Sequence, residues 1–126
     1  FGLMSPSDVA ALYRGKKFEK KIPAVCFKIN KAWSKNMSDK QLYNAVRGTW
    51  KLSSKTIQKV EYGIGLCYGV IRAIYKIRRW YRIESRQRWR FSGVIDKKMQ
   101  KYIGYSLKHH PKHKVAGPIF YINIEL

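Results

Sequence analysis

The chain has 126 residues, of which 45% are hydrophobic and 14% aromatic. This length allows one compact domain with its own core, and this apolar content excludes a chain that its charge keeps disordered. Its 27 lysines and arginines against 7 acidic residues give a net charge of +20 at pH 7. Such a charge favours a polyanionic partner, nucleic acid above all, over an anionic membrane surface or no dedicated partner.

Neither a membrane segment nor a cofactor motif is apparent in the sequence. No run approaches the roughly 18 apolar residues of a membrane span, and the N-terminus lacks the order of segments typical of a signal peptide. Cys26 and Cys67 lie within apolar runs, AVCFKI and GLCYGV, with no second cysteine nearby. We therefore expect an intracellular, cytoplasmic protein with buried thiols, no metal and no cofactor.

The first 23 residues are expected to form a basic N-terminal arm. Within it, SPSDVAALYR predicts a short helix over residues 5–14, which Ser5 or Ser7 would cap and Gly15 would end. Residues 24–126 are expected to form the single nucleic-acid-binding domain.

The domain is predicted to begin with a strand and a helix. Apolar residues alternate in AVCFKIN (24–30), which is the period of a half-buried strand. In MSDKQLYNAVRGTW, Ser38 and Gln41 have the spacing of a capping box, and Gly48 is a typical C-terminal residue. A helix is therefore predicted over residues 39–47.

From Trp50 onward the chain is predicted to be mainly extended. Trp50 and Leu52 are expected to leave the helix in extended form, and the polar residues 53–59 to hold at most one helical turn. VEYGIGLCYGVIRAIYKI (60–77) is dense in β-branched and aromatic residues and contains glycines that weaken a helix. A hairpin is predicted at Tyr68-Gly69.

The strand over residues 70–78 is predicted to have an inward and an outward side. Residues 71, 73, 75 and 77 would face inward, and residues 72, 74, 76 and 78 would face outward. Because a helical wheel also groups Cys67, Val70, Ile71, Ile74 and Tyr81, a helix stays open as an alternative.

The C-terminal third is predicted to add two strands and a short helix. In RWRFSGVI (88–95), Trp89, Phe91 and Ile95 lie on one side and the arginines on the other. A short helix would end near Gly104, and PIFYINIEL would form the last strand. The predicted fold class is α+β, with a small mixed or barrel-like β-sheet flanked by two or three short helices.

The segment YKIRRWYRIESRQRWRF (75–91) combines cations with aromatic residues. If residues 70–78 and 88–95 are strands, the cations lie on their outward sides and on the loop between them, which is an arrangement that can neutralise several phosphates. Trp80 and Tyr81 would stack on unpaired bases. The expected phosphate contacts are Arg72, Lys76, Arg78, Arg79, Arg82, Arg86, Arg88 and Arg90.

A second basic edge is predicted in LKHHPKHK, where Lys108, Lys112 and Lys114 surround the three histidines. The surrounding lysines repel a metal cation, so phosphate contact is the favoured role. His109 or His110 as a general base in RNA cleavage is the catalytic alternative. The few acidic residues form no cluster for a two-metal nuclease.

Several segments together resemble a pattern in small bacterial and phage proteins: VCFKIN, LYNAVRGTWKL, VEYGIGLCYGVIRAIYKI, RWRFSGVI, KYIGYSL and PIFYINIE. Over roughly residues 24–125 the arrangement is similar to PUA-like domains of the ASCH, EVE and YTH type. The resemblance implies a small β-barrel whose concave side accepts RNA or a flipped base. The positions that match are Arg47, Trp50 and residues 68–72, and further along the chain cations stand where acids are usual.

The sequence therefore predicts a non-catalytic nucleic-acid-binding protein that favours RNA over DNA. Two alternatives share its charge: a structural component of a ribonucleoprotein or phage assembly, and a small histidine-dependent nuclease. A membrane-surface protein would require residues 70–86 to form one helix.

Overall fold

The computed structural model describes residues 16–83 and 88–125. The helix predicted over residues 5–14, like Arg86, lies outside the described residues. The described residues form six strands, two helices and two 3₁₀ turns (η), in this order: β1 (Ala24–Lys28), α2 (Asp39–Arg47), β2 (Trp50–Lys51), α3 (Ser54–Ile57), β3 (Tyr62–Cys67), β4 (Val70–Ile83), β5 (Arg88–Ile95), η1 (Lys97–Tyr102), η2 (Pro111–Lys114) and β6 (Ile119–Ile122).

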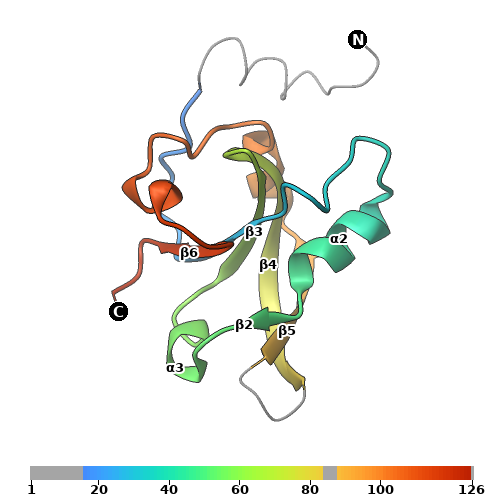
Figure 1. Ribbon diagram of the computed structural model, residues 1–126, viewed down its shortest axis with the longest axis vertical. Coiled ribbons are helices and arrows are strands. Elements are labelled where there is room, and N and C mark those ends of the chain that lie inside the picture. The colour runs from blue at the N-terminus through green and yellow to red at the C-terminus, as the bar shows by residue number, and fades with distance from the viewer. Residues whose placement is uncertain (1–15, 84–87, 126) are drawn as a thin grey trace.

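The six strands form one sheet in the order β2-β5-β4-β3-β1-β6. Strands β1 and β3 are parallel, and the other neighbouring pairs are antiparallel. The sheet curls into a half-barrel with α2 beside it (Figure 1). The predicted α+β class with a mixed, barrel-like sheet is thereby confirmed.

Helix α2 has the predicted bounds and the predicted capping box. The Ser38 hydroxyl accepts a hydrogen bond from the Gln41 N–H at 3.1 Å, and the Gln41 side chain accepts one from the Ser38 N–H at 2.8 Å. The helix ends at Gly48, which has φ 111°. A Cβ atom there would lie 2.8 Å from the Trp89 carbonyl oxygen, so only glycine lets the chain pass directly into β2.

The predicted hairpin joins β3 and β4. Tyr68 and Gly69, at the two central positions of the turn, have φ 49° and 81°, which matches the type I′ turn typical of two-residue hairpins. The helix kept open for this segment is wrong, because residues 70–83 are one continuous strand.

Strand β4 differs from the prediction in length and in its two sides. It continues to Ile83, so Arg79 and Arg82 belong to the strand and not to a loop. An irregularity opposite Gly65 and Leu66 places an extra residue, Arg72, between the paired residues 71 and 73. As a result Ile71 and Ile74 share one side, and Ile74 is buried although it was predicted to face outward.

Both sides of the central sheet are buried. The concave side carries Val25, Phe27 and Phe91 with side chains of α2 and α3. Phe27 of β1 stacks on Trp50 of β2 at 4.6 Å between ring centroids, a contact that strands so far apart in the sheet can make only across the inside of the curl.

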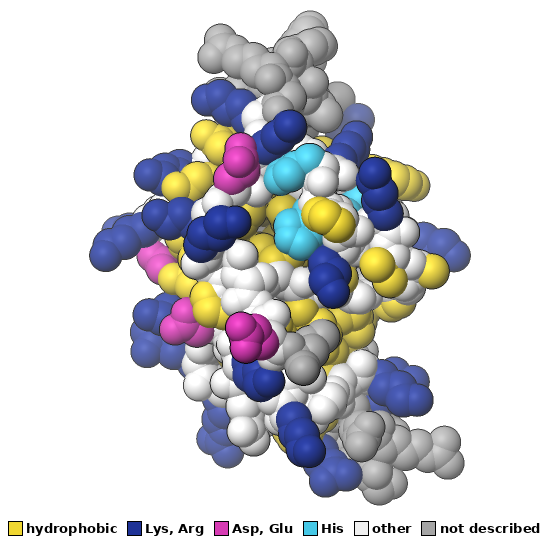
Figure 2. All heavy atoms as spheres, turned by 90° about the vertical axis from the view of Figure 1, so that its left-hand side faces the viewer, with side chains coloured by type: hydrophobic (Ala, Val, Ile, Leu, Met, Phe, Trp, Pro, Cys, Tyr) yellow, Lys and Arg dark blue, Asp and Glu magenta, His cyan; other side chains and the backbone are white. Residues whose placement is uncertain are grey.

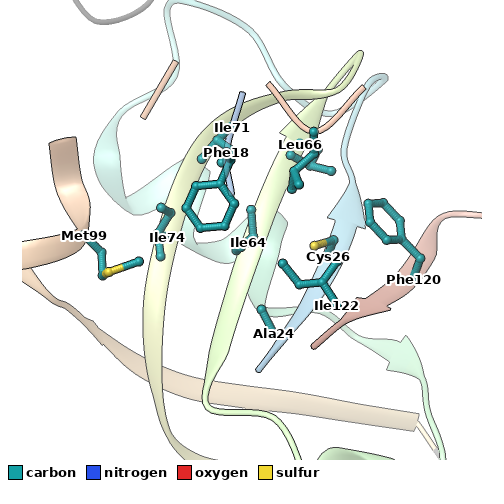
Figure 3. Close-up of a cluster of buried hydrophobic side chains, with 11 residues drawn as sticks. Phe18, Ala24, Cys26, Ile64, Leu66, Ile71, Ile74, Met99, Phe120 and Ile122 are labelled. Atoms are coloured by element: carbon teal, nitrogen blue, oxygen red, sulfur yellow. The ribbon is translucent and has the colours of Figure 1, made fainter. Parts of the chain in front are cut away.

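The convex side has a second core (Figure 3), which includes Ile64, Leu66, Ile71 and Ile74 of β3 and β4. Phe18 and Met99 cover it from the N-terminal segment and from η1. Phe18 is 2% exposed, so this part of the predicted arm packs into the domain. Cys26 and Cys67 are buried and free, as predicted.

Candidate nucleic-acid interface

Beyond the convex core, β4, β5 and β2 continue as an outer ribbon with two different sides. Trp80 pairs with Phe91 and Arg82 with Trp89, and these positions lie on the concave side because Trp80, Trp89 and Phe91 belong to the concave core. The positions between them must lie on the convex side, since side chains alternate along a strand. We call this surface the convex basic face; it comprises Lys51, Lys76, Arg79, Tyr81, Arg88 and Arg90.

The side chains of the convex basic face are placed by cross-strand pairing. Tyr81 stands opposite Arg90, and Arg88 stands between Ile83 and Lys51. Directly opposed side chains lie about 4.5–5.5 Å apart at their Cβ atoms. The register therefore gathers cations from three separate parts of the chain onto one continuous surface.

Most of this face is open to solvent. Lys51, Lys76, Arg79 and Arg88 are exposed, and Tyr81 keeps 37% of its surface accessible. The guanidinium carbon of Arg79 lies 4.8 Å from the centroid of the Tyr81 ring. Arg90 is half-buried, and its Nε has no hydrogen-bond partner among residues 16–83 and 88–125.

A hydrogen bond marks where the convex core ends and this face begins. The Tyr62 hydroxyl donates to the Asp96 carboxylate at 2.8 Å. Burial and the nearby carboxylate raise the pKa of Tyr62 to about 12, so the hydroxyl keeps its proton. That hydrogen bond, together with the Lys98 N–H and the charges of Lys76 and Lys98, lowers the pKa of Asp96 against an opposing effect of desolvation.

Two residues predicted for the interface lie on the other side of the ribbon. The Trp80 ring packs edge-on against Phe91 at 5.6 Å between centroids, and Arg82 stands opposite Trp89. Trp80 and Tyr81 therefore face opposite ways and cannot form one stacking platform. Arg78 is exposed at a second irregularity, between the paired residues 77 and 79.

Arg47 and Trp50 hold α2 against the sheet. The Arg47 Nε donates to the Phe91 carbonyl at 2.9 Å, and its guanidinium lies 4.9 Å from the Tyr43 ring. The Trp50 indole N–H donates to the Val46 carbonyl at 2.7 Å. Their contacts with neighbouring backbone and rings give both residues a part in the packing.

Arg72 lies away from the convex basic face, near the start of β4. Its guanidinium carbon is 4.2 Å from the centroid of the Trp33 ring. A cavity of about 480 Å³ opens beside it between α2, β4, β5 and η1, with Tyr43, Tyr75 and Gln100 in its wall. Burial, followed by smaller effects of Asp39 and Tyr43, raises the pKa of Tyr75 to about 12, so its hydroxyl is neutral.

The second basic edge is centred on Phe120 of β6. His110 and His113 of the η2 region lie 6.3 and 6.0 Å from the Phe120 ring, and the Lys28 ammonium lies 5.8 Å from it. Figure 2 shows histidine side chains with lysine or arginine around them on this side of the molecule. Lys108, Lys112 and Lys114, the predicted cations of this edge, are all exposed.

Both of these histidines have a pKa below the usual 6.5. Burial is the main cause in each case. The charges of His109, Lys112 and Lys21 add to it at His110, and those of Lys28 and Lys108 add to it at His113. The His110 Nδ1 also accepts a hydrogen bond from the Lys112 N–H at 3.1 Å, which requires that nitrogen to be unprotonated. Within the described ranges no three His, Cys, Asp or Glu side chains are grouped as a metal site would require.

Sequence reasoning missed Lys51 and Lys28. Lys51 follows Trp50 in a strand of only two residues, and its place opposite Arg88 depends on a pairing between distant segments. Lys28 reaches the second basic edge from β1, where its ammonium donates to the Val115 carbonyl at 2.8 Å. The alternation of residues along a strand predicts which side of the sheet a side chain faces. It does not predict which strand lies next to it.

Comparisons with protein-family models, curated proteins and solved structures found no match. Among residues 16–83 and 88–125, no helix has the length and apolar character needed to cross a membrane.

Proposed function

We propose that this protein binds nucleic acid without catalysing a reaction, and that single-stranded RNA is its favoured ligand. The observation that carries the proposal is the convex basic face, where cations and an exposed tyrosine occupy one side of a ribbon whose other side is packed.

Charge supports a polyanion as the ligand. Strands β2, β4 and β5 contain no aspartate or glutamate, so no carboxylate of these strands competes with a bound phosphate. Side chains on one side of a strand recur about every 7 Å, and neighbouring strands lie about 4.8 Å apart. The face therefore offers a two-dimensional array of cations that several phosphates can contact together, with an affinity that falls steeply as salt is added.

The tyrosine supports a single strand over a duplex. Tyr81 is exposed among arginines, and an aromatic ring in such a setting can stack on an unpaired base, which a duplex does not offer. Arginine adds a planar cation that can both stack and bind phosphate.

The curled sheet with short flanking helices also supports a PUA-like arrangement as a part of this proposal. The proposed surface lies on the convex side of the sheet. In this respect it differs from the concave site that the resemblance implies.

The proposal is tested with a double variant, Arg79→Glu with Arg88→Glu, in fluorescence anisotropy with a labelled single-stranded RNA. Affinity should fall by at least about ten-fold, and the dependence of log K on log salt should become shallower, because phosphate contacts are lost. The matched control is Lys35→Glu with Lys55→Glu, which makes the same change in net charge at exposed positions elsewhere. Equal affinities for the two double variants would show that the face is not the binding surface.

A further inference from the structure

A second surface, distinct from the convex basic face, lies around the β3–β4 turn. Its components come from four segments: the exposed Tyr68 at the turn, Lys28 from β1, Lys108 from the segment before η2, and His110, Lys112 and His113 around η2. We call these six residues, which add Tyr68 to part of the second basic edge, the tip cluster.

Several contacts hold the tip cluster together. The Tyr68 N–H donates to the Asn30 side chain at 2.7 Å, and the Leu107 N–H donates to the Gly69 carbonyl at 2.8 Å. A Cβ atom at Gly69 would collide with the Lys108 side chain and lie 3.2 Å from the His113 Nε2. The cluster is therefore assembled by the fold and is not a set of unrelated surface lysines.

The composition of the tip cluster suits an anionic strand with exposed bases. Tyr68 is 67% exposed, more than any other large hydrophobic side chain of the described residues. Lys108, which lies against Gly69 of the turn, and Lys112 are exposed, and the imidazoles add hydrogen-bonding groups next to Phe120. Exposed aromatic rings among cations are typical of surfaces that bind single strands.

Distance separates the tip cluster from the convex basic face. Lys76, the first residue of the face along β4, is seven residues beyond Gly69 (76 − 69), and Arg79 is ten beyond it (79 − 69). These spacings correspond to roughly 20 and 30 Å in a strand. Figure 1 shows the β3–β4 turn and the far end of β4 at opposite ends of the molecule.

Acidic side chains lie at the end of the convex basic face that is nearer the tip cluster. The Glu61 charge lies close enough to Tyr62 to raise the pKa of that hydroxyl, and the Asp96 carboxylate accepts a hydrogen bond from it. Tyr62 is paired with Lys76. Both carboxylates therefore lie beside the middle of β4. Carboxylates there repel a phosphate backbone that would run from one surface to the other, so the two surfaces favour separate strands.

We propose that the tip cluster is a second binding surface for single-stranded nucleic acid and that one molecule of this protein joins two strands. This inference rests on the proposed function of the convex basic face. A protein with two such surfaces would link separate segments, and the link would depend on both surfaces being occupied at once.

The test is a capture experiment with two RNA oligonucleotides of about 12 nucleotides, one attached to beads and one fluorescent. Wild-type protein should retain the fluorescent strand on the beads, and a large excess of protein should abolish retention, because each strand then occupies its own protein molecule. The variant Lys108→Glu with Lys112→Glu should reduce retention by about ten-fold and change binding to a single strand by less than about three-fold.

The matched control for the capture experiment is again Lys35→Glu with Lys55→Glu, which should retain the fluorescent strand as the wild type does. If the tip variant does not fold, as judged by circular dichroism, Lys108→Gln with Lys112→Gln replaces it. Retention by the tip variant equal to that of the control would overturn the inference, since self-association through another surface would then link the strands. Failure of the wild type to bind even one oligonucleotide would instead contradict the proposed function.

Discussion

Arg79 and Tyr81 lie on the same side of β4, and the guanidinium carbon of Arg79 is 4.8 Å from the centre of the Tyr81 ring. The contact orders two side chains that would otherwise be free in solvent. An ordered cation beside an ordered ring lowers the entropy lost when a nucleotide binds both. This pair is therefore expected to dominate the convex basic face.

Substitutions of Tyr81 distinguish the contribution of base stacking to RNA affinity from the contribution of charge. Tyr81→Ala should weaken binding to single-stranded RNA by about 1–3 kcal/mol, because a base loses its stacking partner. Tyr81→Phe keeps the ring and should bind within about two-fold of the wild type. Fluorescence anisotropy measures both, and an alanine variant that binds as tightly as the phenylalanine variant would exclude stacking on this ring.

Arg79 and Arg82 test which side of the ribbon binds. They belong to the same strand but lie on opposite sides, with Arg79 opposite Ser92 and Arg82 opposite Trp89. Arg79→Glu should therefore lower the affinity for RNA several times more than Arg82→Glu at physiological salt, where charges beyond about 8 Å are largely screened. If the order of the two effects is reversed, the ligand lies on the concave side.

Gly48 offers a test of how α2 is joined to the sheet. Gly48→Ala adds a Cβ atom 2.7 Å from the Trp50 ring and 2.8 Å from the Trp89 carbonyl oxygen, in backbone with φ 111°. Gly117→Ala is the matched control, because its φ is 102° and nothing lies within 4 Å of the added atom.

Both alanine variants should lose about 1 kcal/mol of unfolding free energy through the left-handed backbone, and Gly48→Ala should lose a further 1–3 kcal/mol through the collision. Urea denaturation measures the difference. Equal losses of unfolding free energy in the two variants would mean that β2 shifts away from the added Cβ atom without an energetic cost.

The lowered pKa values of His110 and His113 predict how stability depends on pH. In the folded protein both imidazoles hold fewer protons than in the unfolded chain, so their contribution to the unfolding free energy is present above pH 6.5 and is lost as the pH falls below it. A polyanion bound at the tip cluster should have the opposite effect and raise both pKa values.

Urea denaturation between pH 5 and 8 and NMR titration of the imidazoles measure these effects. His113→Gln removes one of the titrating groups and should flatten the dependence of the unfolding free energy on pH. A dependence that is the same in this variant and in the wild type would show that His113 does not contribute.

Local patterns in the sequence predicted the elements of this fold well. Ser38 and Gln41 predicted the start of α2, and Tyr68-Gly69 predicted the turn, since each of these signals depends on residues a few positions apart. The alternation in RWRFSGVI likewise predicted that Arg88 and Arg90 lie opposite in orientation to Trp89 and Phe91.

Long-range pairing and irregularities accounted for what the sequence did not predict. The parallel pairing of β1 with β3 joins residues almost forty positions apart, and no local pattern encodes it. The irregularity at Arg72 moved Ile74 into the convex core, because one extra residue exchanges the two sides of a strand. Trp80 and Tyr81 were assigned to one surface because they were expected in a loop, where alternation does not hold.

The two residues of strand β2 face opposite sides of the sheet. Trp50 stacks on Phe27 inside the curl, and Lys51 lies beside Arg88 on the convex basic face. A slip of one residue in this pairing would turn the lysine toward the apolar interior and the indole toward solvent. The burial of the Trp50 indole therefore favours the pairing register that places Lys51 beside Arg88 on the convex basic face. A variant that weakens the packing of Trp50 should lose affinity for RNA although every cation is still present.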